Sequence, residues 1–61
     1  MIEDIIFLCH AYNINLLDIK TIQSIALKIK RYDLLVYLNS NSIEYIEYVK
    51  KLKLKKHLGS H

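Results

Sequence analysis

Residues 18–29 read DIKTIQSIALKI and carry the clearest periodic pattern in the chain. Apolar side chains recur there every three or four positions, which is the spacing of one face of an α-helix. Either Asn15 or Asp18 can cap this helix, because a short polar side chain can accept a hydrogen bond from a backbone N–H of the first turn. The pattern predicts a helix at the centre of the fold, whose apolar face consists of Ile19, Ile22, Ile25, Ala26 and Ile29.

The segment before this stretch is predicted to form a first helix. Glu3 and Asp4 fall in its first turn, where negative charge interacts favourably with the helix dipole. Residues 12–15 read YNIN and are predicted to end it, because asparagine side chains bond to nearby backbone groups and favour turns. Its apolar face at helical spacing consists of Ile2, Ile5, Ile6 and Cys9.

Two further helices are predicted in the second half of the chain. Asp33 can begin a short third helix, although residues 34–38, LLVYL, also fit a strand because a short apolar run has no clear period. We favour the helix because no second strand is available to pair with the run. Residues 39–42 read NSNS and predict a turn, after which Asn41 and Glu44 can cap a fourth helix.

The chain is therefore predicted to be all-α, a small bundle of four short helices in a single domain. The domain spans residues 1–58, and Gly59-Ser60-His61 resemble the remnant of an expression tag. A domain of about 60 residues buries only about 60% of the surface that its unfolded chain exposes, and one cysteine offers no internal disulfide. Association is the remaining support for so thin a core. We expect a homodimer, because two-fold contacts are the commonest in oligomers.

The fourth predicted helix, residues 42–57, is the expected interface. Its apolar side chains recur every three residues, and two tyrosines widen the same surface with rings that suit an interface rim. The expected interface residues are Ile43, Tyr45, Ile46, Tyr48, Val49 and Leu52. We expect a monomer to leave Phe7, Leu8, Tyr45 and Tyr48 exposed. These features favour a non-catalytic protein-interaction or assembly module that binds its own copy or another helical protein.

The charge pattern raises a second function, the binding of DNA or RNA. The net charge of +3 arises entirely after residue 40, where five lysines face only Glu44 and Glu47. These lysines suit phosphate contacts, but they equally suit a solvated helix C-terminus, where positive charge opposes the dipole. Arginine, the better reader of phosphates and bases, is absent from the cluster. The possible nucleic-acid contacts are Lys50, Lys51, Lys53, Lys55 and Lys56.

Catalysis is not indicated. Cys9 and His10 are neighbours on a predicted helix, so their side chains diverge by about 100° and do not form a nucleophile–base pair. The only glycine is Gly59, which excludes a glycine-rich phosphate loop. We expect no enzyme activity, no cofactor, no metal and no small-molecule substrate.

The single cysteine also bears on location. An unpaired Cys9 on an apolar stripe suggests a reducing compartment and hence a cytoplasmic protein. The first apolar stretch follows Glu3 and Asp4, which is the opposite of the basic start of a signal peptide. No apolar run approaches the roughly 18 residues of a membrane span.

Two known helix pairs share features with residues 21–39. Residues 21–26 followed by 33–38 look like the helix pair of an ankyrin repeat, and the same region can be aligned with a DNA-binding helix-turn-helix. In both alignments, Lys30 stands where the family places glycine. No second copy occurs at the ankyrin period of about 33 residues, and the proposed reading helix is too apolar for a major groove. We assign the chain to neither family.

Overall fold

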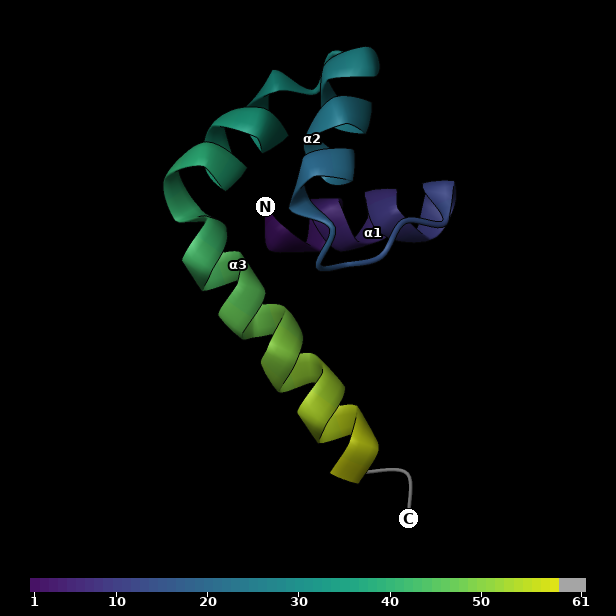
Figure 1. Ribbon diagram of the computed structural model, residues 1–61, viewed down its shortest axis with the longest axis vertical. Coiled ribbons are helices and arrows are strands. Elements are labelled where there is room, and N and C mark those ends of the chain that lie inside the picture. The colour runs from purple at the N-terminus through teal and green to yellow at the C-terminus, as the bar shows by residue number, and fades with distance from the viewer. Residues whose placement is uncertain (59–61) are drawn as a thin grey trace.

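A computed structural model of the chain describes the backbone of residues 1–58 and the side chains of residues 1–53. Within that part the fold is all-α and consists of α1 (Ile2–Tyr12), α2 (Ile19–Lys28) and α3 (Tyr32–Leu58). The helices α1 and α2 lie on one side of α3, whose C-terminal part extends away from both of them (Figure 1). The predicted tag remnant at 59–61 lies outside the described residues.

The central helix α2 forms as its sequence predicts. Asp18 is its N-cap, and its carboxylate accepts hydrogen bonds from the backbone N–H of Thr21 at 3.3 Å and from the Thr21 hydroxyl at 2.8 Å. Asn15, the alternative cap, instead accepts a hydrogen bond from the N–H of Leu17 at 2.9 Å within the preceding loop. The cap thereby fixes where the apolar face of α2 starts.

The helices α1 and α2 end in the same way. Each is followed by a residue in the left-handed conformation, Asn13 with φ 56° and Lys30 with φ 63°. In this type of helix end the next N–H donates back to a carbonyl of the last turn. Those bonds join Ile14 to Cys9 and Arg31 to Ala26, both at 2.8 Å. Lys30 therefore has a backbone that glycine would adopt without steric cost.

The predicted count of four helices is wrong, because the third and fourth are one helix, α3, in the structure. Residues 34–38 are helical within it, so the strand alternative is also excluded. The predicted turn at 39–42 is reduced to a kink at Asn41, where φ is −133° and ψ is 31°. Only this residue leaves the helical conformation, and with no proline or glycine nearby the chain re-enters the helix at once.

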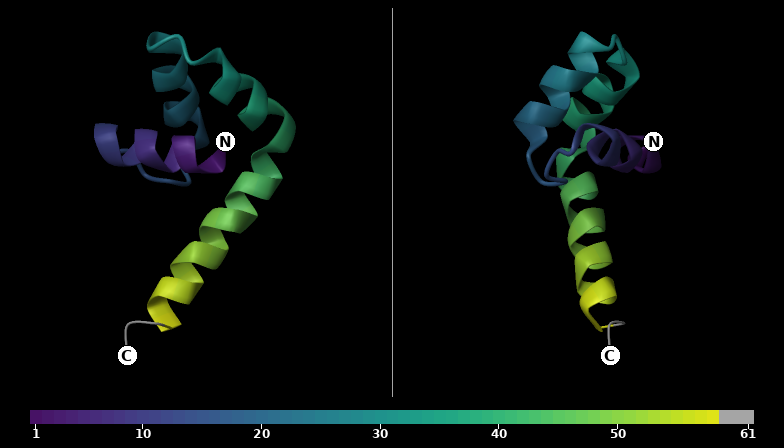
Figure 2. Two further views of the ribbon diagram at one scale, coloured as in Figure 1. Left: turned by 180° about the vertical axis from the view of Figure 1, so that it is seen from behind. Right: turned by 90° about the vertical axis from the view of Figure 1, so that its right-hand side faces the viewer.

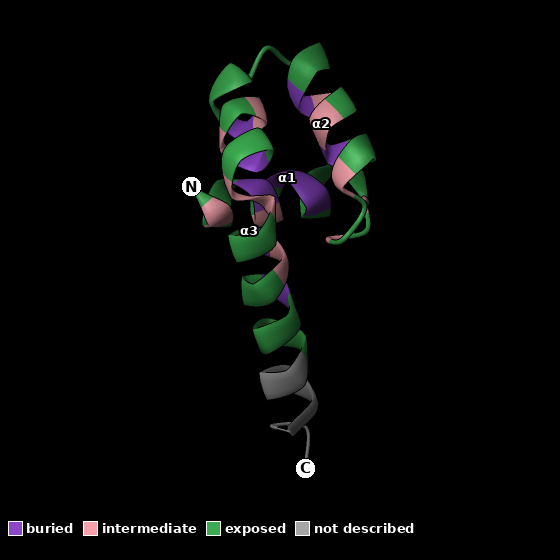
Figure 3. Cartoon of the chain, turned by 60° about the vertical axis from the view of Figure 1, so that its left-hand side comes forward, coloured by how far each residue is buried: buried purple, intermediate pink, exposed green. Residues whose placement is uncertain are grey.

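The core is formed by the facing sides of all three helices (Figure 3). Two predictions of exposure are wrong: Leu8 is 6% exposed and Tyr45 is completely buried. Leu8 shares a helix face with Ile5, and Tyr45 shares one with Val49, so both turn inward. Phe7 and Tyr48 are exposed as predicted. The buried apolar residues are Ile5, Leu8, Cys9, Ile22, Ala26, Leu34, Leu38, Tyr45 and Val49.

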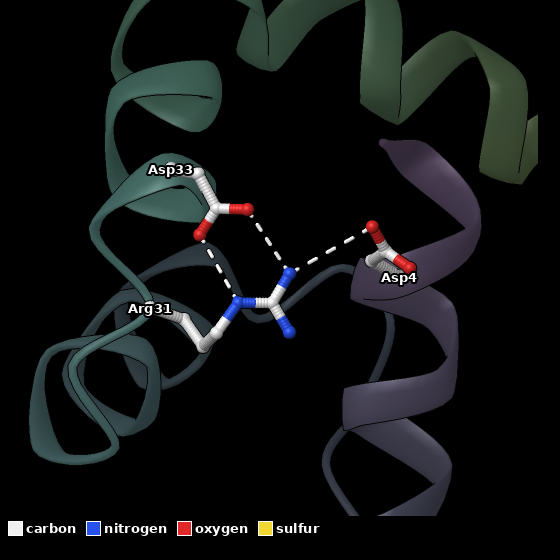
Figure 4. A network of polar contacts seen from close by, with 3 residues as sticks. All are labelled: Asp4, Arg31 and Asp33. Atoms are coloured by element: carbon white, nitrogen blue, oxygen red, sulfur yellow. Dashed lines mark hydrogen bonds and ion pairs between the residues drawn. The ribbon is translucent and has the colours of Figure 1, made fainter.

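Polar contacts join the helices at the surface. Arg31, in the turn before α3, donates two hydrogen bonds to the carboxylate of Asp33, at 3.1 and 3.0 Å, and its guanidinium lies 3.7 Å from Asp4 on α1 (Figure 4). Between α2 and α3, the Gln23 amide donates to the side-chain oxygen of Asn39 at 3.0 Å. These contacts tie the N-terminal half of α3 to the other two helices.

The molecule is elongated along α3. Its dimensions are 40 × 22 × 16 Å and its radius of gyration is 11.9 Å, against about 10.5 Å for a compact chain of this length. Figure 2 shows that the excess comes from the C-terminal part of α3, which continues beyond α1 and α2. The long helix therefore offers surface that the rest of the chain does not cover.

Candidate interaction surface

The side of α3 that faces away from the core carries large apolar side chains. Tyr32, Val36 and Ile43 are 55%, 64% and 72% exposed. Glu47 and Lys50 continue the same line and are also exposed. On each side of the kink at Asn41, the positions of this line fall within about 60° of one another and lie nearly opposite the buried residues of that part of α3. We call the five residues the outer stripe.

The N-terminal part of the outer stripe arises because residues 34–38 of α3 are apolar on every side. Leu34 and Leu38 are buried, Leu35 and Tyr37 are half-buried, and Val36 is exposed. A helix that is apolar all round is normally buried all round. Here α1 and α2 cover only one side of α3, so the opposite side is left facing water.

The six residues predicted for the interface do not form one surface. In an α-helix, each step of three residues rotates about 300° around the helix axis, which is about 60° short of a full turn. After three such steps, Ile43 and Leu52 lie on opposite sides of α3. Ile43 lies on the outer stripe, while Tyr48 and Leu52 are exposed elsewhere on the helix. The structure places Tyr45 and Val49 in the core and leaves Ile46 half-buried against it.

The lysines near the end of α3 are exposed where they are described. Lys50, Lys51 and Lys53 cover about 160° of the helix circumference, so they do not form a single line. In residues 1–53, every ion pair involves Arg31, and none involves a lysine. The side chains of Lys55 and Lys56 lie outside the described residues.

The face of α3 next to the outer stripe is hollowed. A shallow depression of about 530 Å³ lies between the N-terminus of α1 and the first half of α3. Rings and aliphatic chains form most of its wall, together with one carboxylate and two small polar side chains. The lining residues are Met1, Tyr32, Asp33, Val36, Tyr37, Ser40 and Asn41. The depression thus extends the apolar surface beyond Tyr32 and Val36.

A buried polar contact in the core was not predicted from the sequence. The Tyr45 hydroxyl donates a hydrogen bond of 2.6 Å to the carbonyl of Leu16, in the loop between α1 and α2. Burial raises the pKa of Tyr45 far above its ordinary value, and the neighbouring Cys9 adds to this shift. Tyrosines are common at interface rims, so spacing alone gave no signal that this one was internal.

Cys9 lies beside Tyr45 in the interior, and His10 is exposed, so the predicted divergence of the two side chains is confirmed. Burial raises the pKa of the Cys9 thiol, and a hydrogen bond with Tyr45 opposes that shift only in part. At neutral pH Cys9 is therefore a protonated thiol that packs as a small apolar group. Residues 1–53 contain no group of three side chains placed to hold a metal ion.

The described helices do not meet the requirements of a membrane-spanning helix. None of α1, α2 and the described part of α3 combines the length and the apolar character needed to cross a membrane.

Comparison with protein-family models, with curated proteins and with solved structures finds no match to this chain.

Proposed function

We propose that the chain is a non-catalytic protein-interaction module that self-associates as a homodimer through α3. One observation carries the proposal: the outer stripe exposes Tyr32, Val36 and Ile43 on the side of the helix opposite the core. Large exposed apolar side chains on the outer side of a helix are typical of interaction sites. Exposed Asn39 and Ser40 divide them here into Tyr32 with Val36 and, separately, Ile43.

The energy available supports association. Complete burial of a valine or isoleucine side chain is worth about 1.5–3 kcal/mol relative to exposure. Covering Ile43 in both copies would therefore contribute a few kcal/mol, which is large against the roughly 5–15 kcal/mol stability of a typical domain. For a chain with only nine buried apolar residues in its described part, that contribution is substantial.

Sedimentation equilibrium at micromolar concentration tests the proposal. We expect the wild-type chain to be dimeric and Ile43→Lys to dissociate it, because the lysine would place a charge in the apolar contact. Phe7→Lys is the matched control, since Phe7 is 75% exposed but lies on α1; it should remain dimeric. A monomeric wild-type chain, or equal dissociation by both variants, would contradict the proposal.

The second candidate function is binding of DNA or RNA by the basic end of α3. It is favoured by the exposure of Lys50, Lys51 and Lys53, none of which forms an ion pair within residues 1–53. Titration with duplex and single-stranded oligonucleotides at about 50 mM salt is the test, because phosphate contacts are strongest at low salt. An absence of binding at that salt concentration would exclude this function.

A further inference from the structure

We infer that two copies pair through antiparallel α3 helices, with Glu47 of each copy against Lys50 of the other. The inference rests on the proposed function in one respect, namely that the chain self-associates. It adds which part of the outer stripe makes the contact, the direction of the two helices and their register.

The spacing of the outer stripe supports helix pairing. Ile43, Glu47 and Lys50 are separated by four and then three residues, which is the alternation of a two-helix seam. All three are exposed, and Ile43 is 72% exposed. The next position at this spacing, residue 54, is a leucine in the sequence. Within the described side chains, the seam therefore has one apolar residue followed by two opposite charges.

A two-fold axis near residues 48 and 49 matches this seam to itself. With antiparallel helices, Glu47 lies opposite Lys50 of the second copy, and position 43 lies opposite position 54. The same axis brings Glu44 within two residues of Lys51 of the second copy, about 3 Å along the helix axis, on the same flank of the helix. One axis thus forms two symmetric sets of complementary charges.

The charges are available for such contacts. Glu44, Glu47, Lys50 and Lys51 are all exposed. None of them forms an ion pair within residues 1–53, where the ion pairs found join Arg31 to Asp4 and Asp33. Pairing between copies would therefore not break an ion pair in the described structure.

Other arrangements of the same stripe are less favourable. Parallel helices in register would place Glu47 against Glu47 and Lys50 against Lys50, and such like-charge contacts are costly. An antiparallel shift of one heptad would place Glu47 against Ile43, which leaves a covered charge without a partner. Polar residues within a seam commonly set register and orientation in this way, at some cost in strength.

Charge exchange at the central pair tests the inference. Glu47→Lys and Lys50→Glu should each raise the dimer dissociation constant at least about tenfold, because each creates two like-charge pairs. An equimolar mixture of the two variants should recover association as a heterodimer, and the double variant should recover the homodimer. Recovery on mixing separates a lost contact from a folding defect, and circular dichroism of each variant checks its helix content.

The outcomes separate this inference from the proposed function. A monomeric wild-type chain would contradict both. A wild-type dimer whose association is unchanged by either single substitution, or is not recovered on mixing, would overturn the inference alone.

The direction of the helices has its own measurement. In the antiparallel arrangement, the two copies of residue 43 are offset by eleven residues, or about 16 Å, so Ile43→Cys should form no intermolecular disulfide under mild oxidation. Parallel helices in register would bring the two thiols together. Because Cys9 is 1% exposed, the wild-type chain serves as the control, and rapid disulfide formation specific to Ile43→Cys would overturn the antiparallel arrangement.

Discussion

Lys30 shows how a single residue can work against the local structure it occupies. Its φ of 63° lies in the left-handed region, where a side chain with a Cβ is disfavoured by about 1–2 kcal/mol. The helix end nevertheless forms, because the N–H groups of Lys30 and Arg31 reach the carbonyls of Leu27 and Ala26 at 3.1 and 2.8 Å. The hydrogen bonds of the turn therefore hold the strained position in place.

Replacing Lys30 with glycine should stabilise the fold. Lys30→Gly removes the steric cost, and part of that gain is offset by the greater freedom of glycine in the unfolded chain. We expect the free energy of unfolding, measured by urea at fixed protein concentration, to rise by about 0.5–1 kcal/mol. A decrease would show that the lysine side chain contributes more to the folded state than the backbone strain costs.

Tyr45 anchors the loop between α1 and α2 through its hydrogen bond to Leu16. Tyr45→Phe keeps the ring in the core but removes the donor, so we expect the free energy of unfolding to fall by about 1 kcal/mol. Tyr48→Phe is the control, because the Tyr48 hydroxyl forms no hydrogen bond in the described part of the chain and its ring is 40% exposed. Equal effects of the two substitutions would argue against the anchoring role.

At the scale of the elements, the sequence predicted α1 and α2 well because their ends carry local signals. Asn13 and Asp18 act within one turn of the positions they terminate or cap. The continuity of α3 was not predicted, since NSNS resembles a full turn, whereas only Asn41 leaves the helical conformation in the structure. The predicted interface assumed that residues spaced by three lie on one face of the helix. With that spacing, successive side chains instead shift by about 60° around the helix axis.

The two sides of α3 should respond differently to truncation. Leu38 is 1% exposed and Val36 is 64% exposed. Leu38→Ala creates a cavity in the core and should lower the free energy of unfolding by about 2–5 kcal/mol. Val36→Ala, studied at a concentration low enough to keep the chain monomeric, should change it by no more than about 0.5 kcal/mol. A large loss from Val36→Ala in the monomer would mean that the outer stripe is covered within the chain.

At the scale of the whole molecule, the contacts of Arg31 with Asp4 and Asp33 link α1 to the start of α3. They also make the free energy of unfolding depend on pH. The hydrogen bonds from Arg31 lower the pKa of Asp33 below its ordinary value. A lowered carboxyl pKa stabilises the fold above the ordinary pKa, and that contribution is lost as the pH falls through the lowered value.

The carboxyl resonance of Asp33, followed by NMR in an acid titration, measures this link. We expect its midpoint to lie below the ordinary value of about 3.9 for aspartate, and Arg31→Gln should move the midpoint upward. Unfolding of the wild-type chain should become easier as the pH falls through the wild-type midpoint. An Asp33 midpoint that is unchanged in Arg31→Gln would show that the guanidinium does not hold the carboxylate in solution.

The whole molecule is a thin core with one long helix, and its outer stripe has no cover within the described chain. Sedimentation equilibrium of the wild-type protein across micromolar concentrations therefore tests the account most directly. Self-association through α3 predicts a species of twice the chain mass of 7.2 kDa, and dissociation in Ile43→Lys. A wild-type protein that sediments at the mass of one chain throughout that range would contradict it.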